Sequence, residues 1–178
     1  PGQVSYPGVT TSAVYGNVAN HAQAFNRVAV LDAPNSATAA TVISAASGVQ
    51  AAANDPSYAS MFAPWLIVPG VVSTNPASVS TAALNRTVAP SSLAAAKMAA
   101  NDQSSDANVP AAGIAKGVSA YAVNVSQVYS ASDRANLNTA GVNVIRNVPN
   151  VNVIAIYGFR SLAFDPSWQF LNNVRFRM

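Results

Sequence analysis

Two apolar runs near the end of the chain constrain the fold more than any other feature. Val142–Arg146 and Val151–Tyr157 both have the composition of β-strands, and only residues 147–150 separate them. A connection this short cannot cross over between parallel strands, so the runs are predicted to pair as an antiparallel hairpin. The second run is apolar on both faces, which is typical of a strand inside a covered sheet. We therefore expect it to be central.

The rest of the chain alternates between predicted strands and helices. Apolar runs predict extended segments at 28–31, 61–62, 65–68 and 118–128, and a polar loop is expected at 73–87. Helical composition and spacing predict helices over 38–53 and 90–104, and a shorter one capped by Ser132 and Gly141. This order predicts an α/β fold, with α+β as the alternative, in which helices cover a mixed β-sheet with a central apolar strand.

The two ends of the chain are expected to differ from its centre. Residues 1–25 are rich in Gly, Pro and Thr and are predicted to be an irregular lead-in, whereas residues 26–178 form the core domain. In the last segment, Phe170, Val174 and Phe176 alternate with polar residues, which predicts a terminal strand.

Charged residues make up only 8% of the chain, against about 25% in an average domain, and glutamate is absent. Two explanations stay open: a compositional habit of the host, or a surface that neighbouring molecules cover. The nine Lys and Arg are dispersed, so we expect no nucleic-acid partner. No apolar run approaches the roughly 20 residues that cross a bilayer, so no direct membrane insertion is expected either.

The sequence offers little for catalysis. His21 is the only histidine, and no Gly-X-Ser-X-Gly turn presents a serine to it. Most aspartates fall at turns or helix starts, where local backbone chemistry explains them; Asp32 stands before Ala-Pro. There is no cysteine and no phosphate-binding loop. The prediction is a protein without catalytic residues, metal ligands or cofactor.

Three arginines are candidate inter-subunit contacts: Arg160, Arg175 and Arg177. Arg160 follows the turn after the second apolar run, and its alternative role is to hydrogen-bond nearby carbonyls within the chain. Arg175 and Arg177 would share one face of the terminal strand, where charges also serve to keep an edge from aggregating.

Four blocks in a fixed order resemble the central, subtilisin-like domain of contractile phage tail sheath proteins. They are "NRVAVLDAP", "YASMFAPWLIV", the segment 88–113 that contains "PSSLAAAK", and the segment 137–178 that contains "LNTAGVN", "YGFRSL", "DPSW" and "NNVRFRM". The chain departs from the family pattern at several positions: Arg-Thr-Asp is Ala100-Asn101-Asp102, a Trp is Tyr157, a Thr is Ser161, and a final Arg-Arg is spread over Arg175-Phe176-Arg177.

The resemblance implies a structural subunit rather than an enzyme. Such subunits stack in rings around a tail tube and contract to drive the tube through a cell envelope. The implied partners are other sheath subunits, the tube protein, and baseplate and tail terminator proteins. The implied location is the virion tail, with assembly in the host cytoplasm. The resemblance also places the N-terminal arm and the C-terminal domain of the full protein outside this chain.

Two other functions are weighed beside this one. A subtilisin-shaped hydrolase would need a serine at a helix start within reach of His21. A host- or carbohydrate-binding module of a virion would need exposed aromatic residues, whereas Trp65 and Trp168 stand in apolar contexts.

Overall fold

The computed structural model describes residues 2–70 and 85–177, apart from the side chains of residues 176 and 177. Most of the loop predicted at 73–87 therefore lies outside the described residues. The elements are β1 (Gly2–Ser5), α1 (Ser12–Ala24), β2 (Arg27–Asp32), α2 (Ala39–Ala52), η1 (Pro56–Tyr58), β3 (Ala59–Ala63), β4 (Leu66–Pro69), β5 (Asn85–Val88), α3 (Pro90–Ser104), α4 (Gly113–Lys116), β6 (Asn124–Val125), α5 (Ala131–Thr139), β7 (Val142–Val148), β8 (Val153–Tyr157), η3 (Pro166–Trp168) and α6 (Leu171–Arg177).

The main sheet has five strands in the order β1-β2-β3-β7-β8. The first four strands run parallel, and β8 pairs antiparallel with β7. All five residues of the central strand β3 are buried, as expected for a parallel strand covered on both faces. The α/β prediction with a mixed sheet is thus confirmed.

The predicted hairpin forms, but its second strand is not central. β8 lies at the edge of the sheet, with Arg146 paired to Ala155 in register. Ile154 and Ile156 are buried all the same, because they belong to the core cluster on the α3 side of the sheet. Residues 117–119 run along the outer edge of β8 and bond to its backbone. The amide of Ser119 donates to the Ile154 carbonyl at 2.8 Å, and the Ile156 amide donates to the Gly117 carbonyl at 3.0 Å. Packing against the α3 side of the core buries the side chains of this edge strand, and the loop satisfies its outer backbone groups.

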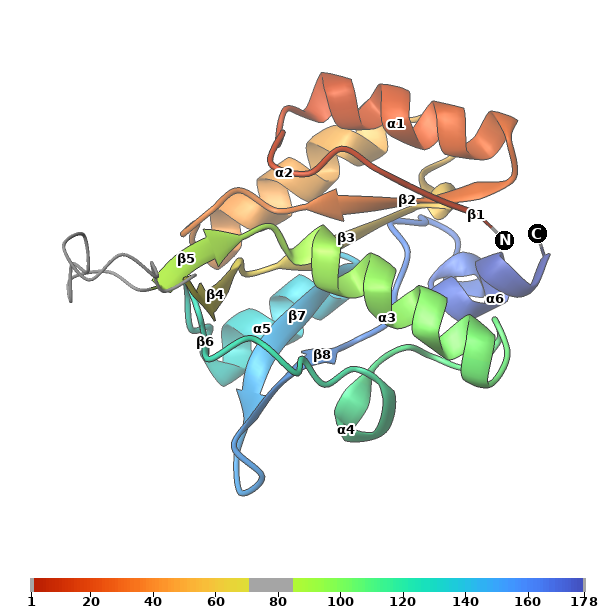
Figure 1. The fold of residues 1–178 in the computed structure, drawn as a ribbon. Coiled ribbons are helices and arrows are strands. Elements are labelled where there is room, and N and C mark those ends of the chain that lie inside the picture. The colour runs from red at the N-terminus through yellow and green to blue at the C-terminus, as the bar shows by residue number, and fades with distance from the viewer. Residues whose placement is uncertain (1, 71–84, 178) are drawn as a thin grey trace, which may run out of the picture.

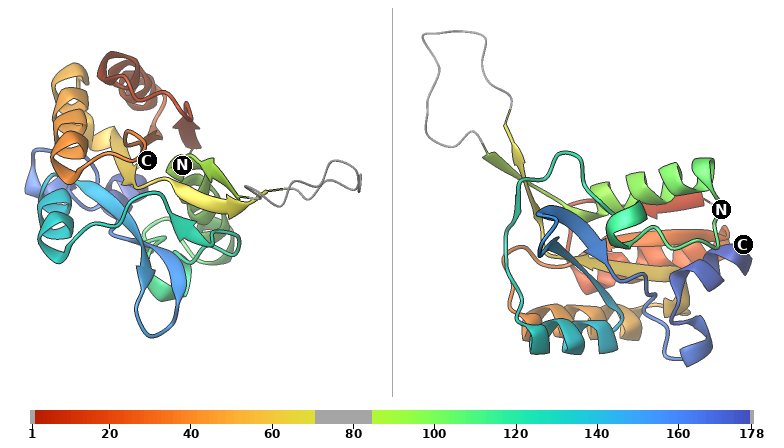
Figure 2. Two further views of the ribbon diagram at one scale, coloured as in Figure 1. Left: turned by 90° about the vertical axis from the view of Figure 1, so that its left-hand side faces the viewer. Right: turned by 90° about the horizontal axis from the view of Figure 1, so that it is seen from below.

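Helices cover both faces of the main sheet. Figure 2 shows α1, α2 and α5 on one side and α3 on the other. Tyr15, Val42 and Leu137 belong to the core on the first side, whereas Met98 packs with Phe62 on the second. Both ends of the described chain lie at the end of the molecule opposite the β4–β5 pair (Figure 1).

A small antiparallel sheet, in the order β5-β4-β6, adjoins the main one. The chain enters it from β3 through the cis peptide bond Ala63–Pro64. The strand predicted over 118–128 is mostly wrong, because only Asn124–Val125 pair with β4 and Val118 makes a single bridge. The rest of that segment hydrogen-bonds as a loop; Ser126, for example, donates its amide to the Trp65 carbonyl at 2.8 Å.

Residues 1–25, predicted to be irregular, contain β1 and the 13-residue helix α1. β1 adds to the sheet beside β2, and α1 buries Tyr15, Ala19 and Ala22 at helical spacing. The helix also packs closely on α2: a Cβ on Gly16 would lie 2.6 Å from that of Ala52. The segment is therefore largely regular, and its small residue Gly16 permits close packing of α1 on α2.

The terminal strand prediction is also wrong, because residues 171–177 form the helix α6. Leu171, Val174 and Arg175 are buried, and their i, i+3, i+4 spacing is that of one helix face. The short helix before β7 is confirmed, but its N-cap is Ser130 instead of Ser132. Ser130 and Asp133 form a reciprocal capping box there.

Candidate subunit interface

The backbone of Arg160 is tied to the centre of the main sheet. Its amide donates to Asn143 Oδ1 at 2.6 Å. Its carbonyl accepts from Ser60 Oγ at 2.7 Å and from Asn143 Nδ2 at 2.9 Å. Ser60 and Asn143 are fully buried on β3 and β7. Two polar side chains inside the sheet thus fix where the chain runs after β8.

The side chain of Arg160 is half-buried and reaches across to the loop before α6. Its Nη1 donates to Gln169 Oε1 at 3.0 Å, and its Cζ lies 5.5 Å from the centre of the Phe170 ring. The guanidinium therefore binds a side chain rather than the nearby carbonyls that the sequence suggested. Phe170 itself is 51% exposed, so this corner remains open to a neighbour. An inter-subunit role for Arg160 stays a prediction.

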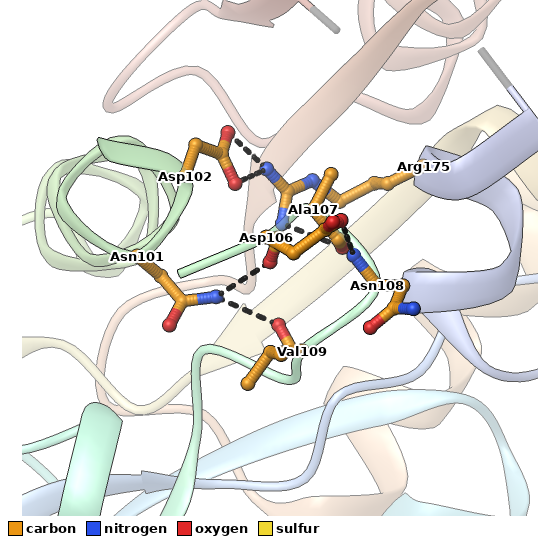
Figure 3. A network of polar contacts seen from close by, with 7 residues as sticks. All are labelled: Asn101, Asp102, Asp106, Ala107, Asn108, Val109 and Arg175. Carbon is orange, nitrogen blue, oxygen red and sulfur yellow. Dashed lines mark hydrogen bonds and ion pairs between the residues drawn. The ribbon is translucent and has the colours of Figure 1, made fainter. Parts of the chain in front are cut away.

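Arg175 is an internal residue, which corrects its proposed place in an interface. Its side chain is 1% exposed and is paired with the carboxylate of Asp102 on α3 through Nη2 (Figure 3). Its Nη1 donates to the Ala107 carbonyl at 3.4 Å. Arg175 lies on the buried face of α6, so its side chain joins α6 to α3 within one chain. We call this contact the α3–α6 junction. The side chain of Arg177 lies outside the described residues.

A second contact closes the loop that follows α3. Asn101, which is 2% exposed, donates from Nδ2 to the carbonyls of Asp106 at 3.2 Å and Val109 at 2.8 Å (Figure 3). Ala100-Asn101-Asp102 stands where the sheath pattern has Arg-Thr-Asp. Asn101 holds the loop after α3, and Asp102 holds α6.

His21 and Asp32 do not meet. His21 is exposed in the last turn of α1, where its ring packs 4.6 Å from that of Phe25, just before β2 begins. Asp32 ends β2, so the two side chains belong to opposite ends of that strand. Ser91 stands at the start of α3, but it is fully buried and its Oγ donates to Asp32 Oδ2 at 3.0 Å. The arrangement required of a Ser-His-Asp hydrolase is absent from these residues.

The network around Asp32 is a feature that sequence reasoning missed. Asp32 is 1% exposed and accepts from the amides of Ser91 at 2.6 Å and Gly8 at 3.1 Å, besides the Ser91 hydroxyl. Burial raises the pKa of this carboxyl, and the hydrogen bonds from Ser91 and Gly8 oppose that rise. The Asp32 amide donates to Tyr15 Oη at 3.1 Å, and burial followed by the Asp32 charge raises the pKa of Tyr15.

This network holds three separate segments at the end of β2: the turn at Gly8, helix α1 and the start of α3. Local sequence identified Asp32 only as a turn residue. The partner serine follows 59 residues later, at a helix start, and no local pattern connects the two. The network is structural and buried.

Several large apolar side chains are exposed, but neither of the two tryptophans is among them. Trp65 is half-buried and donates from Nε1 to the Ala33 carbonyl at 2.7 Å. The large apolar side chains that are at least half exposed come from several elements: Tyr6, Phe25, Ile114, Tyr121, Val123, Val128, Val151, Phe164 and Phe170. These side chains are scattered singly over the surface, which is common in soluble proteins and does not by itself mark a ligand groove.

Two kinds of site are not found in the described part of the chain. No helix between residues 2 and 70 or 85 and 177 is long and apolar enough to cross a membrane. Within the same ranges, no group of three or more His, Cys, Asp or Glu side chains could hold a metal ion.

No protein-family model matches the chain, and no curated protein matches it. Solved structures do match. A chain of the six-fold symmetrised anti-feeding prophage baseplate aligns over 99% of this chain with a TM-score of 0.71 and 20% identity. One in that prophage's contracted helical sheath aligns over 98%, with a TM-score of 0.70 and 20% identity. A chain in the contracted sheath complex of the PVC extracellular contractile injection system aligns over 84% of this chain, with a TM-score of 0.60 and 22% identity.

The chain therefore has the α/β fold of chains found in contractile sheath and baseplate assemblies. The predicted resemblance to contractile sheath proteins is confirmed at the level of the fold. The match covers 42%, 43% and 37% of those three chains, so this chain spans about two-fifths of their length.

Proposed function

We propose that this chain is the core domain of a structural subunit of a contractile sheath. The subunit polymerises around a tube and contracts to drive that tube through a cell envelope. Its partners are further sheath subunits, the tube protein, and baseplate and terminator proteins, in a virion tail or a phage-derived injection particle. The observation that carries the proposal is the alignment of almost the whole chain with chains of a contracted sheath and of a baseplate.

Two features of the molecule support this role. The core is built from two packed layers of helix on a mixed sheet, and the α3–α6 junction and the Asp32 network fasten its outlying segments. Such a domain can move as a rigid body during a large rearrangement. The scarcity of charge and the exposed apolar side chains favour burial of its surface against neighbours.

The hydrolase alternative has one observation in its favour, which is the Ser91–Asp32 contact at 3.0 Å. A nucleophile must be reachable, whereas Ser91 is fully buried and donates to the acid itself. We therefore expect His21→Ala to leave particle assembly and delivery unchanged. Loss of delivery by particles that assemble normally would revive a chemical role for His21.

The proposal is tested by assembly. Full-length protein carrying this domain, produced together with its tube protein, should form tubes that pellet and that show helical striations by electron microscopy. Production without the tube protein is the matched control and should yield fewer or irregular tubes. Full-length protein that stays monomeric beside preformed tubes would contradict the proposal.

A further inference from the structure

A pocket of about 360 Å³ lies between α5 and the β7–β8 hairpin. Arg134 and Asn138 line it from α5, Arg146 from β7, and Tyr157 from the end of β8. A second hollow of about 260 Å³ also has both arginines in its wall. The two arginines are 12 residues apart in sequence and line the same pocket because α5 packs on β7.

Arg146 is held in place without being neutralised. Its Cζ lies 4.0 Å from the centre of the Tyr157 ring, so the guanidinium is stacked on an aromatic face. Its Nε is buried and has no hydrogen-bond partner in the described part of the chain. Arg134 donates from Nη1 to the Tyr129 carbonyl at 2.7 Å, a neutral acceptor. Neither arginine therefore forms an ion pair with another of the residues that the structure describes.

No acidic side chain among the described residues lines the pocket. Its walls contain none of the six aspartates, and the chain has no glutamate. Asp133, the neighbour of Arg134 in sequence, points instead to the helix start, where Oδ2 accepts from the Ser130 hydroxyl at 2.7 Å and the Ser130 amide at 3.2 Å. Among the described residues, the one ion pair is that of Arg175 with Asp102. An uncompensated pair of arginines in a pocket favours an external anion.

We propose that this pocket receives the carboxylate of an aspartate or glutamate side chain from a neighbouring protein subunit. A guanidinium fork matches a carboxylate with two parallel hydrogen bonds, and stacking on Tyr157 fixes the plane of that fork. Tyr157 and Asn138 also line the pocket, and both side chains carry hydrogen-bond donors. The basic site is one pocket rather than a stripe along the surface, which favours a single side chain over a nucleic-acid backbone. The identity of the neighbour rests on the proposed sheath function; the anion site does not.

The direct test measures binding of N-acetyl-aspartate amide to the 178-residue chain by NMR. Saturable shifts are expected at the side-chain N–H groups of Arg134 and Arg146. The uncharged N-acetyl-asparagine amide, of the same size, should not reproduce them. Replacing both residues, Arg134→Gln with Arg146→Gln, should weaken binding about tenfold or more, because two charge-assisted hydrogen bonds are lost. Arg27→Gln, which changes an exposed arginine outside the pocket, is the matched control and should bind like the parent chain.

Three results would overturn the proposal: equal shifts with both amides, unchanged binding by the double variant, or tighter binding of a single-stranded oligonucleotide at the same residues. If the double variant does not fold, Arg146→Lys replaces it. That variant keeps the charge and loses the fork, so binding should weaken while the melting temperature stays close to that of the parent chain.

Assembly then separates this proposal from the proposed function. Full-length protein with both arginines replaced should form fewer tubes than the Arg27→Gln control at the same concentration. Normal tubes from the double variant would overturn the pocket's role and leave the sheath function standing. Absence of tubes from the unsubstituted protein would count against the sheath function, whereas the binding measurement would still decide whether the pocket takes a carboxylate.

Discussion

At the α3–α6 junction, Arg175 is buried against a carboxylate of its own chain, whereas at the β7–β8 hairpin Arg146 faces a pocket that contains none. The two side chains have the same charge and the same donors. The first joins two helices and leaves a donor, Nη1, for the Ala107 carbonyl. The second rests on an aromatic ring. One arginine has its counter-charge inside the domain, and the other has none among the described residues.

This difference separates stability from assembly. Removing one member of a buried ion pair leaves an uncompensated charge in the protein, which is costly. Removing an arginine that has no acidic partner breaks no ion pair and opens no cavity in the core. The free energy of unfolding should therefore change little. Arg160 is intermediate, because its guanidinium is half-buried and bonded to a neutral side chain.

The largest effect is expected at the junction. Asp102→Asn leaves the Arg175 charge buried without a counter-charge and should lower the free energy of unfolding by about 3 kcal/mol. Asp102 itself is 26% exposed, which holds the loss to the lower end of the usual range for buried pairs. Urea unfolding monitored by circular dichroism measures it. Asp106→Asn, at an exposed aspartate on the adjoining loop, is the control; equal losses would mean that the ion pair is not the cause.

A second expected effect concerns Asp32, a buried acid that is held by amides and a hydroxyl instead of an arginine. Folding raises its pKa above the ordinary value of 3.8, so the folded chain binds this proton more tightly than the unfolded chain does. The stability contributed by this group is complete below about pH 3.8 and is lost as the pH rises through the raised folded-state pKa.

The free energy of unfolding of the parent chain, minus that of Asp32→Asn, should accordingly fall as the pH rises through this window. Other titrating groups cancel in the subtraction. A difference that instead grows with pH would mean that the hydrogen bonds from Ser91 and Gly8 outweigh the cost of burial.

Arg160→Ala should have a smaller effect on the domain, about 1 kcal/mol, because it removes one hydrogen bond to Gln169 and a ring contact. If Arg160 also bridges subunits, full-length protein should assemble poorly or contract prematurely although the domain remains folded. Thermal unfolding of the domain and electron microscopy of full-length assemblies measure the two parts. A loss of stability as large as that of Asp102→Asn would identify Arg160 as an internal strut.

The smallest effect on the fold is expected at the pocket. Arg146→Gln should change the free energy of unfolding by about 0.5 kcal/mol, the value of a partly exposed cation–π contact. The same urea titration measures it. A loss near 3 kcal/mol would break the comparison, because Arg146 would then stabilise the domain as Arg175 does.

The outcome of each sequence prediction depended on how far apart the interacting residues are. The hairpin of β7 and β8 was predictable because a short loop permits only antiparallel pairing. Its place at the sheet edge was not, since residues 117–119 cover it from an earlier part of the chain. The pattern at 170–177 fits either an alternating strand or a helix face, and burial of Arg175 against α3 selects the helix.

Local chemistry in the sequence was enough to predict the strands at 28–31 and 61–62 and the helices α2 and α3. The scarcity of charge and the sheath-like order of blocks are properties of the sequence itself. Which arginine is internal and which is free was decided in three dimensions. Arg175 meets Asp102 across 73 residues, and Asp32 meets Ser91 across 59. Backbone propensity and hydrophobic period act over a few neighbouring residues, whereas a charge is neutralised by whatever the fold brings within a few ångströms.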